Sequence, residues 1–209
     1  ATHKAIAAGQ DPASAWAAYE QRKTQLQDDY AFVADTNLGG EFMAPERIER
    51  IRSIAGQTWW RHFSDRIGLS HEEERRMRSG PEPALPVQEP LLADKPHHIV
   101  PRGPDKAIDP QHGFRVKVPE HLYNAGEVYN LCIARGTLTE EERFKINEHI
   151  IQTIVMLDNM PFPKHLRRVP EYAGTHHETL TGSGYPRKLT AAELSVPSRI
   201  MAIADIFEA

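Results

Sequence analysis

The sequence predicts an all-α protein, a helical bundle built on two long periodic segments. Residues 12–35 place aromatic and aliphatic side chains at helical spacing among charged and small ones, as expected for one amphipathic helix. Thr139 and Glu142 have the spacing of a capping box and precede a long apolar stripe of helical period. The final residues also keep a helical pattern, so the C-terminal third is expected to be largely helical.

The remaining helices are assigned in chain order. A second helical region begins near Pro45, a residue suited to a first helical turn, and runs on to the tryptophan pair at 59–60. Ser70, with Glu73 three residues later, caps a short third helix. After the helix that follows the Thr139 capping box, a short helix through residues 166–173 leads into a glycine-rich turn.

A proline-rich segment divides the chain. Residues 79–119 are dense in proline and show little periodicity, so we expect a long irregular surface segment without regular elements. The chain then has two parts, a helical insertion with this segment over residues 1–118 and a C-terminal part over residues 119–209. Within the segment, His97 and His98 have the chemistry of metal ligands, but an isolated pair in such a loop is more often solvated surface.

Composition narrows the class of protein. A net charge of -4 with interspersed signs argues against a nucleic-acid polymer as partner and leaves a small nucleotide open. The single cysteine, Cys132, forms no internal disulfide, so a cytoplasmic location is expected. No apolar stretch approaches the roughly 20 residues of a membrane-spanning helix, so no membrane contact is expected from this segment. The missing initiator Met and the helical pattern at the last residues predict a fragment of a longer chain.

Imidazoles and a carboxylate gather in the last third of the chain. His149 lies at the edge of its apolar stripe and is expected to point inward; taken alone, a core histidine bonded to a backbone carbonyl is favoured. His176 and His177 follow a helix end, where adjacent rings can diverge toward two metal ions. Asp205 lies among apolar residues, where a metal would satisfy a buried charge. Glu178 is either a ligand or an acceptor that fixes an imidazole tautomer.

This combination of ligands suits iron, manganese or zinc better than magnesium or calcium, and hydrolysis by a metal-bound hydroxide is the matching reaction. The turn that follows has a separate role. Gly182 and Gly184 permit positive φ angles and a close approach to a ligand, and Pro186 fixes the exit. Tyr185 is then either aimed at that ligand or packed on the core.

The stretch HHETLTGSGYP resembles the HHExxDGxGYP motif of the HD-GYP family, metal-dependent phosphodiesterases of the HD superfamily that cleave cyclic di-GMP. The resemblance runs over about residues 122–209 and implies an HD-domain-like helical bundle. It also implies a cluster of two or three divalent ions, usually iron or manganese, with a water nucleophile held between them. By position, the resemblance assigns metal ligation to His149, His176, His177 and Asp205. Arg187 is then available to contact a phosphate.

The chain departs from the family pattern in three ways. No His-Asp dyad occurs in its 209 residues. In the subgroup that it resembles, this dyad precedes an insertion similar to residues 1–118, so we expect a cut chain that is inactive alone. Thr181 replaces the family aspartate, which removes a carboxylate that helps to order the loop. The basic substrate-contacting residues that the family places after the final helix are also absent.

The leading interpretation is therefore the C-terminal part of a cyclic di-GMP phosphodiesterase. One alternative is a non-catalytic module that docks a diguanylate cyclase (GGDEF) domain or another signalling partner. The contact would be made by the loop that carries Gly184, Tyr185 and Pro186, the GYP loop. Another is an HD-superfamily phosphohydrolase that acts on other nucleotides, which would not need that loop. A homodimer is left open.

Overall fold

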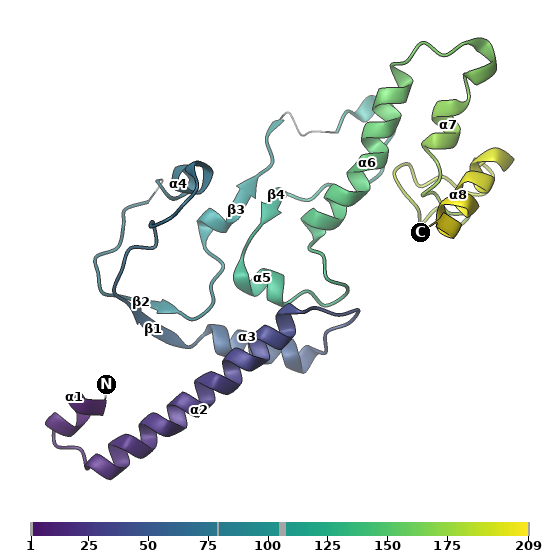
Figure 1. Ribbon diagram of the computed structural model, residues 1–209. Helices are drawn as coiled ribbons and strands as arrows, with labels where there is room; N and C mark the ends of the chain where they lie inside the picture. Colours follow the sequence, from purple (N-terminus) through teal and green to yellow (C-terminus); the bar gives the residue numbers. More distant parts are fainter. Residues whose placement is uncertain (1, 79, 105–107, 209) are drawn as a thin grey trace. The chain divides into compact units, whose positions relative to one another are not determined.

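The computed structural model describes residues 2–78, 80–104 and 108–208 (Figure 1). Helices dominate it, which confirms the predicted all-α class, and its strands are only three or four residues long. The helices are α1 (Thr2–Ala7), α2 (Pro12–Asn37), α3 (Pro45–Ala55), α4 (His71–Met77), α5 (Glu127–Leu131), α6 (Glu140–Asp158), α7 (Val169–Ala173) and α8 (Val196–Glu208). Single 3-10 turns are η1 (Pro96–His98), η3 (Pro110–His112) and η4 (Lys164–Leu166). None of the described helices is long and apolar enough to cross a bilayer.

Capping residues and a first-turn proline account for the positions at which three helices begin. At α6 the Thr139 hydroxyl accepts from the Glu142 N–H at 3.2 Å, and the Glu142 carboxylate accepts from the Thr139 N–H at 2.9 Å. Ser70 and Glu73 make the same reciprocal pair at α4. Both predicted capping boxes are thus confirmed, and each satisfies backbone donors that a helix start leaves open. Pro45 occupies the first turn of α3, as predicted.

The proline-rich segment is less irregular than predicted. Strands β2 (Val87–Pro90) and β3 (Ile99–Pro101) lie inside it and pair antiparallel with β1 (Thr58–Arg61) and β4 (His121–Asn124), respectively. The tryptophan pair therefore lies on a strand, and its assignment to a helical region is wrong. Proline favours extended backbone, and its missing N–H costs nothing at the end of an edge strand.

The described residues divide into two compact units, each made of two separated segments. The first combines residues 1–98 with 125–137, and the second combines 99–124 with 138–209. In the first unit, Ile51 and Ile54 of α3 are buried, and the Asp29 carboxylate on α2 accepts from the side chain of Gln57 at 2.8 Å. The predicted helix at 12–35 is present as α2, but its aromatic residues stay largely exposed. The predicted division of the chain into a part over residues 1–118 and a part over residues 119–209 stays a prediction.

The second unit holds the segment singled out by its histidines. Its core is formed by Ile150, Ile151 and Ile154 of α6, against which Phe114 and Tyr185 pack. Helix α7 packs against both α6 and α8 (Figure 1). The residues that follow α7 are therefore held beside α6.

Candidate metal centre

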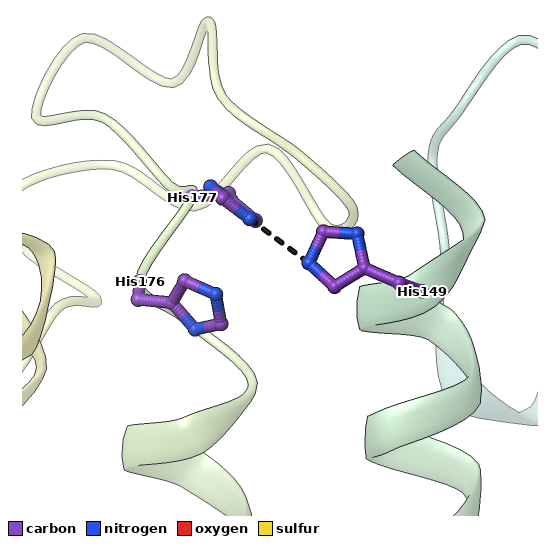
Figure 2. Close-up of side chains that lie close together, drawn as sticks. All are labelled: His149, His176 and His177. Carbon is purple, nitrogen blue, oxygen red and sulfur yellow. Dashed lines mark hydrogen bonds between the residues drawn. The ribbon is translucent and has the colours of Figure 1, made fainter. Parts of the chain in front are cut away.

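Three histidine side chains converge in the second unit. Figure 2 shows His149 on α6 facing His176 and His177, which follow the end of α7. One ring nitrogen of each histidine lies within 4.8 Å of those of the other two. Within residues 2–78, 80–104 and 108–208, no other group of three histidine, cysteine or acidic side chains has this spacing. His97 and His98 lie in η1 and gain no third partner of this kind within those residues, but they are half-buried rather than solvated surface, and Nδ1 of His98 accepts from the Lys95 N–H at 3.2 Å.

The convergence depends on close packing of two helices. Gly174 follows α7, and a Cβ placed there would lie 2.7 Å from Cγ1 of Ile154 on α6 and 2.8 Å from the carbonyl oxygen of Pro170. Both distances are shorter than a van der Waals contact, so only glycine lets the chain approach α6 this closely. The histidines begin two residues later, and this contact brings them to the same stretch of α6 as His149.

Backbone carbonyls fix the tautomers of two rings. The Nδ1 atom of His149 lies 2.6 Å from the carbonyl oxygen of Ile146, and Nδ1 of His176 lies 2.7 Å from that of Ala173. A carbonyl oxygen only accepts, so each Nδ1 carries the hydrogen and each Nε2 keeps its lone pair. Metal-binding histidines are typically oriented in this way. The His149 side chain is exposed, so the expectation that it points inward is wrong, and so is the burial that the core-histidine alternative required. The bond to a backbone carbonyl, which that alternative also required, is present.

The imidazole of His177 is in direct contact with that of His149. Nε2 of His177 lies 3.1 Å from Nε2 of His149 (Figure 2). Nδ1 of His177 lies 3.8 Å from Oδ2 of Asp205. Burial lowers the pKa of His177, His176 and His149 lower it further, and the Asp205 carboxylate opposes them, which favours the neutral ring. A neutral His177 ring can donate from Nε2 to the Nε2 lone pair of His149, so one hydrogen atom satisfies this contact. Three imidazole nitrogens this close together are also a donor set that fits a divalent ion.

Two expectations about these ligands need correction. The rings of His176 and His177 do not diverge, because their centroids are 4.2 Å apart and both face His149. Asp205 is not buried: its side chain is 45% exposed, and apolar residues around it on α8 are exposed as well. The desolvation argument for this carboxylate is therefore wrong, although the carboxylate does lie beside His177. It lies outside the group of three histidines.

The GYP loop is fastened to the histidine pair. A Cβ on Gly184 would lie 2.5 Å from both the His177 carbonyl oxygen and the Glu178 Cα, so this position requires glycine for close approach. Gly182 requires it for a different reason, a φ of +74°. The Tyr185 N–H donates to the His177 carbonyl at 3.2 Å, and the buried Pro186 follows. The expectation that Tyr185 packs on the core is confirmed, and its ring also stacks on His177. That Tyr185 is aimed at a ligand stays a prediction.

Glu178 has neither of the roles weighed from the sequence. Its buried carboxylate accepts from the backbone N–H groups of Arg187 at 2.7 Å and Leu189 at 2.8 Å. It therefore orders the exit of the loop and contacts no imidazole nitrogen. No sequence signal separates this role from that of a ligand, because the two amides approach it only after the chain has turned back.

Arg187 is engaged away from the three histidines. Its Nε donates to the carbonyl oxygen of His112 at 2.9 Å, and its guanidinium lies 5.6 Å from the ring centroid of Phe114 and 4.0 Å from the Asp158 carboxylate. Asp158 follows His149 by nine residues on α6, a rise of roughly 13 Å along the helix. In this arrangement Arg187 does not face the histidine cluster. The contact to His112 crosses 75 positions, which explains why no local pattern indicated it.

Thr181, in place of the family aspartate, belongs to a cluster of hydroxyls. Its Oγ1 lies 3.1 Å from that of Thr179 and 2.9 Å from Oγ of Ser183, and these two are themselves 2.9 Å apart. The Ser183 N–H also donates to Thr179 at 3.0 Å. Hydroxyl groups thus order the tip of the loop.

Several proteins of known activity are similar to part of this chain. The 3'3'-cGAMP-specific phosphodiesterase 1 of Vibrio cholerae is 39% identical over 106 residues, which cover 46% of this chain and 24% of that protein. A cyclic di-GMP phosphodiesterase of Thermotoga maritima is 41% identical over 81 residues, 38% of this chain and 21% of that protein. A cyclic di-GMP phosphodiesterase of Vibrio cholerae is 30% identical over 95 residues, 42% of this chain and 19% of that protein. The chain thus spans less than a quarter of the length of these relatives.

No solved structure matches the chain. A family model described as HD domain matches residues 86–209, which is more than half of the chain and includes all three converging histidines. The chain therefore belongs to the HD-domain family of metal-dependent phosphohydrolases.

Proposed function

We propose that this chain is part of an HD-GYP phosphodiesterase that hydrolyses cyclic di-GMP with the help of divalent metal ions. One observation carries the proposal: three imidazoles converge, and backbone carbonyls hold His149 and His176 in the tautomer whose Nε2 lone pair can bind a metal. A bound divalent ion supplies Lewis acidity and a water of lowered pKa, the chemistry that phosphodiester hydrolysis needs. Iron or manganese, and a second or third ion, are part of the same proposal.

The chain's own residues hold and orient this centre. His149, His176 and His177 would be its ligands, and Asp205, beside the Nδ1 of His177, is proposed as a fourth. Such carboxylates either bind the ion or fix the imidazole that does. We propose that the remaining ligands come from a His-Asp dyad outside these residues, so that the 209-residue chain alone has no turnover. A cytoplasmic location belongs to the same proposal.

The substrate class rests on the relatives. Their names describe enzymes for 3'3'-cGAMP and for cyclic di-GMP, and both compounds are cyclic dinucleotides. The GYP resemblance favours cyclic di-GMP. The net charge of -4 gives the chain no general attraction for an anion, so local metal charge is the expected means of binding the phosphates.

The first test measures metal binding by the 209-residue chain. Titration calorimetry with Mn²⁺ should show binding to the wild type and a loss of at least about 10-fold in affinity for His176→Ala. His165→Ala is the matched control, since this exposed histidine in η4 lies outside the cluster, and it should bind as the wild type does. Equal affinity for Mn²⁺ in the wild type and both variants would reject the proposed metal centre.

The second test measures turnover in a longer protein that contains both this chain and a His-Asp dyad. It should hydrolyse cyclic di-GMP, and His176→Ala should not. Faster hydrolysis of 3'3'-cGAMP would change the substrate and keep the reaction class. Full metal loading without hydrolysis of either compound would reject the proposed phosphodiesterase activity.

One alternative keeps a specific observation in its favour. The tip of the GYP loop is exposed, including Leu180 and the hydroxyls of Thr181 and Ser183, which gives a partner such as a diguanylate cyclase domain access to it. In a binding assay with that domain, Leu180→Asp would abolish association and His176→Ala would not. The reverse result would reject the docking role.

A further inference from the structure

The orientation of His177 has a different origin from that of its two neighbours. His149 and His176 each donate from Nδ1 to a carbonyl oxygen three residues earlier in the chain. Among the described residues, no carbonyl accepts from the ring of His177; its nitrogens face His149 and, at 3.8 Å, Asp205. Neither contact is a fixed backbone group, so another feature must hold this ring.

The ring of Tyr185 provides that feature. It lies parallel to the imidazole of His177, with ring centroids 4.7 Å apart and an angle of 20° between the planes. Tyr185 also packs against the buried α6 core of Ile150, Ile151 and Ile154. The aromatic ring thus connects the rigid part of the unit to a flat face of the imidazole.

Tyr185 is itself held in register with His177 by the backbone. Its N–H donates to the His177 carbonyl at 3.2 Å, and Gly184 approaches that same carbonyl too closely for any other residue. On the other side, the Glu178 carboxylate holds the N–H groups of Arg187 and Leu189. The loop on both sides of Tyr185 is therefore fastened to the residues that carry the imidazole, and the two rings keep a fixed relation.

The Tyr185 hydroxyl takes no part in this arrangement. Within the described residues it makes no hydrogen bond, whereas the ring makes both the stacking contact and the core contact. We propose that Tyr185 is a positioning residue: its ring face, and not its hydroxyl, holds His177 with Nε2 directed at His149, in the orientation needed for metal binding. This inference rests on the proposed function.

The first test needs no metal and compares wild type with three variants. In the wild type, cross-relaxation should connect the ring protons of Tyr185 and His177, and these His177 signals should lie upfield because of the stacked ring. Tyr185→Phe should keep the upfield shift, and Tyr185→Leu and Tyr185→Met should lose it. Absence of the cross-relaxation in the wild type would overturn the proposal even if the Leu and Met variants failed to fold.

The second test measures Mn²⁺ affinity by calorimetry on the same proteins. Tyr185→Leu and Tyr185→Met should weaken binding by about 10-fold, the usual effect of losing a group that orients a ligand, and Tyr185→Phe by less than about twofold. Tyr123→Leu, a partly exposed tyrosine on β4 of the same unit, is the matched control and should change nothing. A normal affinity in Tyr185→Leu together with a loss in His177→Ala would reject the positioning role alone. No Mn²⁺ binding by the wild type would reject the proposed metal centre, and the ring-proton shifts would then decide the stacking by themselves.

Discussion

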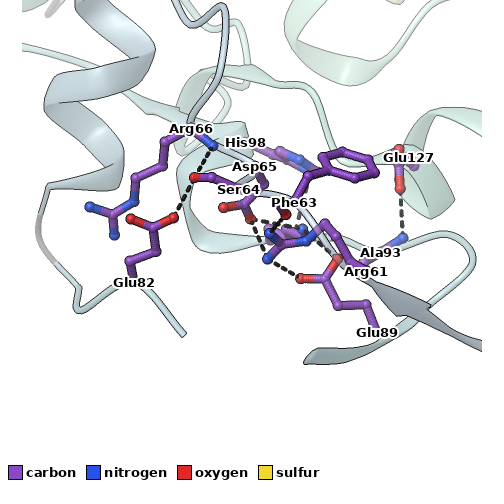
Figure 3. A network of polar contacts seen from close by, with 11 residues as sticks. Arg61, Phe63, Ser64, Asp65, Arg66, Glu82, Glu89, Ala93, His98 and Glu127 are labelled. Atoms are coloured by element: carbon purple, nitrogen blue, oxygen red, sulfur yellow. Dashed lines mark hydrogen bonds and ion pairs between the residues drawn. The ribbon is translucent and has the colours of Figure 1, made fainter. Parts of the chain in front are cut away.

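Each of the two units contains a cluster of partly buried polar side chains. The first cluster combines groups of opposite charge, whereas the second consists of three imidazoles. In the first unit, the buried guanidinium of Arg61 lies 2.9 Å from the Glu89 carboxylate and 3.3 Å from that of Asp65 (Figure 3). Lys95 adds contacts of 3.5 Å to Asp65 and 3.6 Å to Glu89, and the Phe63 carbonyl accepts from Arg61. Two positive and two negative groups thus neutralise one another.

The histidine cluster has no such balance. Its three members are groups of the same kind, and a hydrogen bond of 3.1 Å joins Nε2 of His177 to Nε2 of His149. The ion pairs of the first cluster balance its charges and serve the fold. The three converging imidazoles are instead a donor set that suits a divalent ion. Burial and proximity alone do not separate these cases, whereas the signs of the groups do.

The largest effect is expected from breaking the first cluster. Arg61→Ala removes the buried guanidinium and leaves the half-buried carboxylates of Glu89 and Asp65 with their longer contacts to Lys95. Loss of one partner from such a pair is strongly destabilising. We expect the melting temperature to fall by about 10 °C. Arg52→Ala, which removes an exposed pair with Glu49, is the control and should cost less than about 2 °C. Similar losses in both variants would show that the Arg61 cluster carries no special stability.

The next largest effect is the stabilisation by Mn²⁺, which tests whether the histidine cluster binds an ion or serves the fold. Mn²⁺ at about 100 times its dissociation constant should stabilise the wild type by about 2.7 kcal/mol. His149→Ala should lose this gain and, without metal, unfold at nearly the same temperature as the wild type, because the side chain is exposed. His71→Ala, a highly exposed histidine of the first unit, should keep the gain. A large loss of stability in metal-free His149→Ala would mean that the histidines serve the fold after all.

A smaller, pH-dependent effect is expected at Asp29. Burial alone would raise the pKa of this carboxyl, but hydrogen bonds from Gln57 and Gln25 and the charge of Arg50 outweigh it and lower the pKa. The stabilisation is therefore complete above the unfolded-state pKa, about 3.9, and is lost as the pH falls through the lower folded-state value. Asp29→Ala should cost about 1–3 kcal/mol at pH 7 in urea unfolding. The gap to the wild type should narrow below about pH 4, and a gap independent of pH would contradict the role of this charge.

The smallest effect is expected at the loop tip. Thr181→Ala removes two exposed hydroxyl contacts and should cost less than about 1 kcal/mol. Thr179→Ala should cost more, because it also removes the acceptor of the Ser183 N–H. Urea unfolding of both variants checks the order. If Thr181→Ala were the more damaging, the cluster would depend on that position as the family depends on its aspartate.

The sequence predicted what depends on near neighbours. The starts of α4 and α6 followed from Ser70 and Thr139, because a capping box is made by residues three positions apart. The histidines were also singled out correctly as a group that converges. Features that depend on distant pairing were missed: the strand at Thr58–Arg61 forms because Val87–Pro90 pairs with it. The exposure of Asp205 was missed for a related reason, since the apolar residues around it do not reveal whether another element covers them.

The missing side chain of Gly174 has a consequence for the spacing of the imidazoles. The gap between α6 and α7 is set there, by a hydrogen atom against Ile154, and the imidazoles are carried on the two sides of that gap. A methyl group in its place would act as a spacer and widen the cage that the nitrogens form. The spacing of the three ring nitrogens is thus set by a helix contact in which none of the imidazoles takes part.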